Sequence, residues 1–171
     1  EVDATGLVVA PGFVDLHAHG QSARANEFQA MDGVTTALEL ESGVPHLPTF
    51  LAMRAGDAVI NYGASIAHGA IRTWSMPEYA EAFDNKGPES AWFRQPTAVP
   101  DAAVDEMDDA MVEALSSTIS PARYKELDPE NYPALRERMQ QGLKDGAIGI
   151  GMVHQYYPGV SRDEIFRVFQ F

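Results

Sequence analysis

Residues 8–20 read VVAPGFVDLHAHG and place two histidines at the end of an apolar run. A short run rich in Val and Phe, bounded by Pro and Gly, is typical of a β-strand. Because successive side chains of a strand point to opposite faces, Asp15, His17 and His19 share one face, and the apolar side chains between them share the other. The two imidazoles are therefore predicted to point at the same place.

Residues 34–41, VTTALELE, show the same division into two faces. One face is mostly apolar and the other carries two glutamates, Glu39 and Glu41. Both faces of a doubly wound sheet are covered by helices and are apolar. The strands of a parallel barrel instead pack one face on helices and line a site with the other, at their carboxyl ends. This pattern favours a barrel, with its polar site near the ends of the first two strands.

Strand patterns alternate with helix patterns along the chain. Strands are predicted at 12–19, 34–41, 58–68 and 147–155, and helices within 21–33 and 46–58, closed by Gly33 and Gly56. A further helix is predicted to begin at Asp128 as its N-cap, with Pro129 in the first turn, and to end at Gly146. Alternating strands and helices indicate an α/β protein with a parallel sheet.

Residues 74–127 interrupt this alternation as an α-rich insertion after the third strand. Residues 101–117 predict an acidic amphipathic helix with one apolar stripe, formed by Val104, Met107, Met111 and Leu115. A long insertion after a strand is typical of a segment that covers a site or contacts a partner. A solvated acidic helix on the outside is the plainer interpretation of the same pattern, and both stay open.

Composition excludes some classes of partner. The 171 residues include 25 acidic and 12 basic side chains, for a formal net charge of −13. This excess of negative charge argues against nucleic acid and against an anionic membrane surface as partners. No apolar run reaches the roughly 18 residues of a membrane span. The chain has no cysteine, so it has no disulfide framework and no thiolate chemistry, and its compartment is left open.

The polar face of the first two strands predicts a metal site. Burying two carboxylates beside two imidazoles is costly unless a cation compensates them. Imidazole nitrogens and carboxylate oxygens together suit zinc or a similar first-row ion. A His-x-His pair by itself also fits two hydrogen-bonded histidines without an ion, and that alternative stays open.

The same stretches resemble a known family. GLVVAPGFVDLHAHG resembles the start of the barrel in the metal-dependent amidohydrolase superfamily, where Pro-Gly-Phe-x-Asp-x-His-x-His supplies two metal ligands. DGVTTALELESG, GASIAHGAIR and GLKDGAIGIGMVHQYYPG resemble its second, third and fourth strands. Together they resemble the D-aminoacylase branch, the N-acyl-D-amino-acid and N-acyl-D-glutamate deacylases, outside residues 74–127. The resemblance implies a partial TIM-like (β/α) barrel with about four strands, and zinc-dependent hydrolysis of the amide bond of N-acyl-D-amino acids.

The resemblance also implies a set of metal ligands. His17 and His19 match the two ligands of the first strand. The branch has a Cys ligand at the end of the second strand, and that position is Ser42 here. Glu41 is therefore the candidate replacement and Glu39 the second choice. Many relatives have a carboxylated lysine on the fourth strand, but this chain has none there, so a glutamate is the expected bridge between one or two zinc ions.

Three residues match substrate contacts of the family. His68 and Arg72 correspond to its Gly-His-Gly-x-x-Arg stretch, and Tyr156 corresponds to a tyrosine that contacts substrate in D-aminoacylases. A guanidinium at Arg72 suits a substrate carboxylate. A loop histidine, a surface arginine and a packed tyrosine are the plainer interpretations. His46 and His154 match nothing in the family.

The resemblance further implies that the chain is an amino-terminal half. Residues 1–10 resemble the last strand of a β-sandwich accessory domain, and 11–171 the first half of the barrel. The remaining His ligands and the aspartate base of the family are expected beyond Phe171, so no catalytic base is assigned within the chain. A complete barrel needs about 250 residues. A complementary chain or a homo-oligomer could complete it, with a small N-acyl amino acid as substrate.

Two other functions stay open. The first is a cyclic amidase of the hydantoinase or dihydroorotase type, whose first strand is similar. The lack of a lysine on the fourth strand argues against it. The second is a noncatalytic fragment that binds a partner at its open sheet edge.

Overall fold

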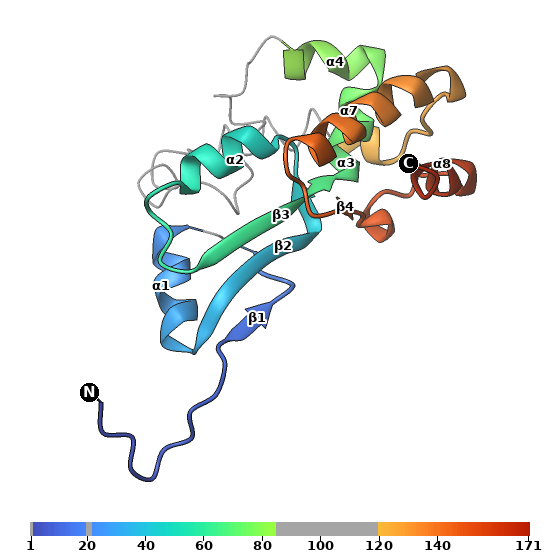
Figure 1. Ribbon diagram of the computed structural model, residues 1–171. Coiled ribbons are helices and arrows are strands. Elements are labelled where there is room, and N and C mark those ends of the chain that lie inside the picture. The colour runs from blue at the N-terminus through green and yellow to red at the C-terminus, as the bar shows by residue number, and fades with distance from the viewer. Residues whose placement is uncertain (1, 20–21, 85–119) are drawn as a thin grey trace.

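A four-stranded parallel sheet organises the chain (Figure 1). The computed structural model describes residues 2–19, 22–84 and 120–171. The strands lie in the order β1-β2-β3-β4, with bounds β1 (Phe13–Asp15), β2 (Val34–Val44), β3 (Asn61–Ala67) and β4 (Ile150–Gly151). Each pair of neighbours is parallel. The α/β class and the parallel sheet are confirmed, and closure of the sheet into a barrel stays a prediction.

Helices follow the strands in sequence, as the parallel connections require. The helices of the described residues are α1 (Ala23–Met31), α2 (Leu47–Arg54), α3 (His68–Trp74), α4 (Pro77–Asp84), α7 (Tyr132–Lys144) and α8 (Arg162–Val168). Short 3₁₀ helices lie at Ser120–Arg123, Pro129–Asn131 and His154–Tyr156. In the part of the chain that the structure describes, no helix has the length and apolar character to cross a membrane.

Apart from the helix predicted at 101–117, the predicted strands and helices are present, with different ends. β1 and β4 are shorter than their apolar runs because each pairs with one neighbour only over a few residues. Asp128 does cap a helix, but its carboxylate accepts from the backbone N–H of Glu130 at 3.1 Å and so begins the 3₁₀ turn Pro129–Asn131. α7 itself begins after that turn, at Tyr132.

The core lies between β3 and the helices α2, α3 and α7 (Figure 1). Its fully buried members come from all four elements and from the segment after the insertion, and include Leu47, Ile66, Ile71, Leu127, Leu135 and Met139. The apolar face of β1 differs from the prediction, because Val14 is 55% and Leu16 is 58% exposed. β1 is the edge strand, and no described helix covers these side chains.

Two predicted segments have no test here. The acidic helix at 101–117 lies outside the described residues. Residues 2–12 contain no helix or strand, and their interpretation as the last strand of a β-sandwich stays a prediction.

Candidate functional site

A local irregularity in β2 builds the candidate site. β2 and β3 pair in regular register up to Glu39 and Ala64, and the next pair is Val44 with Ile66, so β2 carries more residues than β3 in between. This bulge contains Gly43, whose φ of 70° is the left-handed conformation that favours glycine. The carbonyl of Leu40, within the bulge, accepts from the hydroxyl of Ser65 at 2.8 Å. The bulge therefore shapes the end of β2 where the second glutamate stands.

Three side chains from the ends of β1 and β2 converge on one point. Nε2 of His17 lies 2.9 Å from Nε2 of His19 and 3.0 Å from Oε2 of Glu41. Nε2 of His19 lies 3.1 Å from the same carboxylate oxygen. These three atoms, each able to ligate a metal, lie within 4.8 Å of one another. We call this group the His/His/Glu trio.

Glu39 lies behind the trio. Its Oε2 accepts from Nδ1 of His19 at 2.7 Å, and its Oε1 accepts from the backbone N–H of Ser42 at 3.3 Å. Its side chain is only 2% exposed, compared with 31% for Glu41. The hydrogen bond to Glu39 raises the pKa of His19, against the lowering effect of burial and with help from the charges of Glu39 and Glu41. Glu39 thus orients His19 so that its Nε2 faces His17 and Glu41.

The trio fits a divalent cation. In the tautomer of His19 whose Nδ1–H forms the hydrogen bond to Glu39, the lone pair of Nε2 faces the imidazole of His17 and the carboxylate of Glu41. Three electron-rich atoms about 3 Å apart repel one another unless a proton or a cation lies between them. Ligand atoms bound about 2.0–2.1 Å from a tetrahedral zinc ion would lie roughly 3.3 Å apart, close to the observed spacing. Nitrogen and carboxylate oxygen are also the donor types that zinc accepts.

Two of the predicted substrate contacts, His68 and Arg72 of α3, lie in a buried network with Glu164. Nε2 of His68 donates to Oε1 of Glu164 at 2.8 Å, and Nε of Arg72 donates to the same oxygen at 2.9 Å. All three side chains are buried. Burial by itself raises the pKa of Glu164, but the hydrogen bonds and charges of His68 and Arg72 outweigh it, and the pKa is lowered. The roles of His68 and Arg72 as substrate contacts stay predictions.

The guanidinium of Arg72 has further partners on the protein. It donates to the carbonyls of Ala122 at 2.8 Å, Lys125 at 2.9 Å and Gly159 at 3.4 Å. One buried cation therefore connects α3 to the segment after the insertion and to the loop before α8. In this structure the carboxylate that Arg72 binds is that of Glu164.

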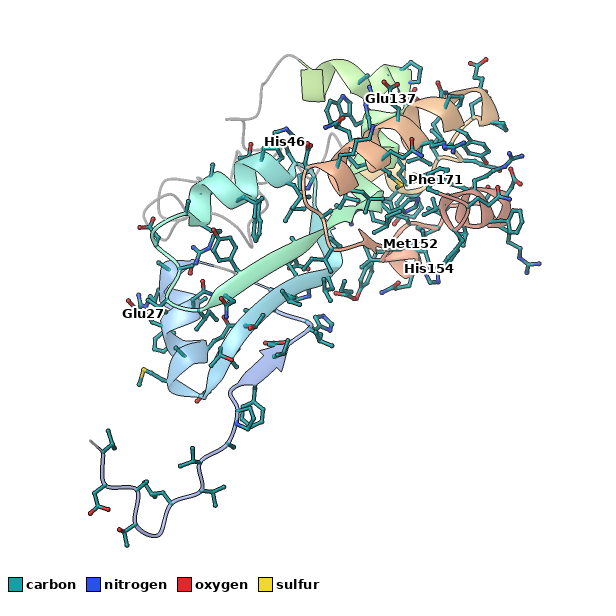
Figure 2. All side chains as sticks on the ribbon, viewed as in Figure 1. Glu27, His46, Glu137, Met152, His154 and Phe171 are labelled. Atoms are coloured by element: carbon teal, nitrogen blue, oxygen red, sulfur yellow. The ribbon has the colours of Figure 1, made fainter. Side chains whose placement is uncertain are left out.

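Tyr156, the third predicted substrate contact, is exposed and lines a hollow that also involves Ser42. His154, two residues earlier, is exposed on the segment after β4, next to Met152 and well separated from Glu27 of α1 (Figure 2). His46 caps α2, because its ring accepts from the backbone N–H of Thr49. These placements leave the His/His/Glu trio as the metal-ligand group found among the described residues.

Sequence reasoning missed Glu164 and Arg123. Glu164 is the fourth residue of the stretch Ser161–Glu164, a pattern typical of a helix start, and Ser161 does accept from the N–H of Glu164 at 3.1 Å. That pattern predicts an exposed capping side chain, whereas the carboxylate is buried against α3. Arg123 also lines the hollow beside Tyr156, and its stretch carries no motif that could have identified it.

Comparison with known proteins gives a consistent picture. The model of the amidohydrolase family matches residues 1–165. A D-aminoacylase of Alcaligenes xylosoxydans xylosoxydans is 27% identical over 175 aligned residues, which cover 98% of this chain and 32% of that protein. The chain thus spans about a third of the length of this curated relative. No solved structure gives a significant match. The chain belongs to the amidohydrolase family.

Proposed function

We propose that this chain forms part of a zinc-dependent hydrolase that cleaves the amide bond of N-acyl-D-amino acids. The observation that carries the proposal is the His/His/Glu trio at the carboxyl ends of β1 and β2. Membership of the amidohydrolase family supports hydrolysis, and the similarity to a protein named D-aminoacylase supports the substrate class. Sites of parallel (β/α) folds lie at the carboxyl ends of their strands, which is where the trio stands.

Each residue of the site has a distinct task in this proposal. His17 and His19 hold the ion through Nε2, and Glu41 holds it through Oε2. Glu39 keeps the ring of His19 in the orientation and tautomer that this requires. A bound zinc ion lowers the pKa of its water and polarises the scissile carbonyl, which allows attack on an amide near neutral pH. In the family that the chain resembles, an aspartate base takes up a proton from that water and passes it to the leaving amine.

The test is a substrate panel on the natural full-length protein. We expect release of free amino acid from N-acetyl-D-amino acids, and none from the L-enantiomers or from hydantoin. Incubation with a chelator abolishes the activity, and added Zn²⁺ restores it. Turnover of hydantoin in place of the linear amides would show a cyclic amidase instead, and full activity after complete metal removal would contradict the proposed role of zinc.

A matched pair of histidine variants tests the ligand set. His17→Ala removes one ligand atom of the trio, so we expect zinc affinity and activity to fall together by more than about 100-fold. His154→Ala removes an exposed histidine of the same chain and leaves both within about twofold. Metal content measured by mass spectrometry gives a readout that is independent of activity. Equal zinc content in the two variants would contradict the ligand assignment.

A further inference from the structure

A hollow of about 230 Å³ is lined in part by Ser42, the residue that follows Glu41. Ser42 of the β2 bulge forms one wall, Gly69 of α3 another, and Arg123, Tyr156 and Tyr157 complete the lining that matters here. Pockets for whole ligands usually measure roughly 300–1,000 Å³. A hollow of this size suits one small group of a larger molecule, and Ser42 connects it along β2 to the His/His/Glu trio.

The hollow carries one positive charge. Among the described residues that line it, Arg123 alone has a charged side chain. The guanidinium carbon lies 5.7 Å from the centre of the Tyr157 ring, in cation–π contact. No carboxylate of the described residues forms an ion pair with Arg123. An arginine on an aromatic face keeps N–H groups at its edge for a planar acceptor.

Hydrogen bonds hold the backbone at Arg123 and at its neighbours. Its carbonyl accepts from the backbone N–H of Gly159 at 2.8 Å. The residues on either side are tied down by the buried guanidinium of Arg72, which donates to the carbonyls of Ala122 and Lys125. These hydrogen bonds already hold the backbone at Arg123, so only its exposed side chain has to be ordered on binding.

Tyr157 is held as firmly. A Cβ added at Gly69 would lie 2.3 Å from Cζ of Tyr157, so the ring packs directly on the backbone of α3. Burial raises the pKa of Tyr157, although the charges of Arg123 and Arg72 and a hydrogen bond from the Arg123 side chain act in the opposite direction. The phenol is therefore neutral near pH 7, and its O–H is able to donate a hydrogen bond.

We infer that this hollow binds the carboxylate of the substrate, with Arg123 as its ionic partner and Tyr157 as a second hydrogen-bond donor. A guanidinium binds a planar carboxylate through two parallel hydrogen bonds. This inference rests on the proposed function, because an N-acyl amino acid carries a carboxylate beside the amide to be cleaved. Ser42 of the hollow directly follows Glu41 of the trio, so one substrate could contact both. In this inference the exposed Arg123, and not the buried Arg72, makes the carboxylate contact.

The experiment measures binding of a small dicarboxylate without any amide cleavage. Succinate and its neutral isostere succinamide are titrated by calorimetry into the natural full-length protein with its metal. Succinate should bind saturably and succinamide should not. Arg123→Gln should weaken succinate binding about 10- to 100-fold, the range expected for a lost charge-assisted hydrogen bond. Arg162→Gln, at an exposed arginine of α8, should leave it within about twofold.

A second arm separates the hollow from the metal. Succinate could also ligate zinc, so the titration is repeated on His17→Ala, where the hollow should still bind it. If His17→Ala lost succinate binding and Arg123→Gln kept it, the carboxylate would be bound by the metal, and the inference would be overturned. Equal binding of succinamide and succinate would overturn it as well. The substrate panel described above decides the proposed function separately, because it can succeed while these titrations fail.

Discussion

Two clusters of histidine and glutamate in this protein have similar internal distances and opposite surroundings. In the trio and Glu39, atoms of the two residue types approach to 2.7–3.1 Å, and in the network of His68, Arg72 and Glu164 they approach to 2.8 Å. The side chain of His17 is 63% exposed, whereas that of His68 is 1% exposed. Distance alone therefore does not separate a site from a structural element.

The difference lies in the source of positive charge. The buried network contains its own cation, because Arg72 sits against Glu164 and donates its other hydrogen bonds to backbone carbonyls. Among the described residues no lysine or arginine forms an ion pair with Glu39 or Glu41. The buried network therefore contains the cation that compensates its glutamate, whereas the glutamates at the trio have no lysine or arginine partner among the described residues.

The largest expected effect comes from removing Arg72, the cation of the buried network. Arg72→Met leaves Glu164 charged, buried and without its main partner, so we expect a loss of about 3–5 kcal/mol in the free energy of unfolding. Urea denaturation at pH 7 measures it, with Arg162→Met as the exposed control. A loss below about 1 kcal/mol would mean that the network is not the stabilising element described here.

The second prediction concerns Glu39 and the zinc affinity of the exposed cluster. Glu39→Gln keeps the size of the side chain but removes the charge that holds Nδ1 of His19, so we expect zinc affinity to fall about 10- to 100-fold. Competition with a zinc-binding dye measures this affinity. Glu27→Gln, on the exposed side of α1 (Figure 2), should behave as the unmodified protein. If Glu39→Gln removed zinc binding completely, Glu39 would be a ligand itself.

The smallest effect concerns pH. The pKa of Glu164 in the folded protein lies below its ordinary value of 4.5. Above pH 4.5 the carboxylate is ionised in both states and its stabilising contribution is complete. As pH falls through the folded pKa, the unfolded chain binds its proton first and the contribution is lost. The stability advantage of the natural protein over Glu164→Gln should therefore shrink below pH 4.5, as urea unfolding at several pH values would show. An advantage that stays constant would contradict the lowered pKa.

Much of the fold and part of the site follow from local sequence. The alternation of strand and helix patterns predicts the parallel sheet, and the period of two in residues 12–19 brings His17 and His19 together even though β1 ends at Asp15. The bulge that shapes the end of β2 depends on Ser65 and Gly43 acting together across two strands. Local patterns carry no sign of that cooperation.

Burial of charge is what the sequence does not disclose. Arg72 and Arg123 are the same residue type, and nothing in their neighbours tells which one is enclosed. The answer depends on Glu164, which lies 92 residues after Arg72 in the chain. Similarly, the pattern of apolar residues in β1 predicts helix contacts, but the exposure of Val14 and Leu16 depends on what lies beside an edge strand.

The network around Arg72 also bears on how the chain folds in time. Its partners lie 50, 53, 87 and 92 residues away along the chain, so long loops must close before the guanidinium meets them. Closing loops of this length costs conformational entropy, and we expect the contacts of Arg72 to form after the rate-limiting step of folding. Interactions absent from the transition state slow unfolding and leave the folding rate nearly unchanged. Arg72 is thus expected mainly to slow unfolding. Arg72→Met should therefore raise the unfolding rate measured at high urea and leave the folding rate nearly unchanged.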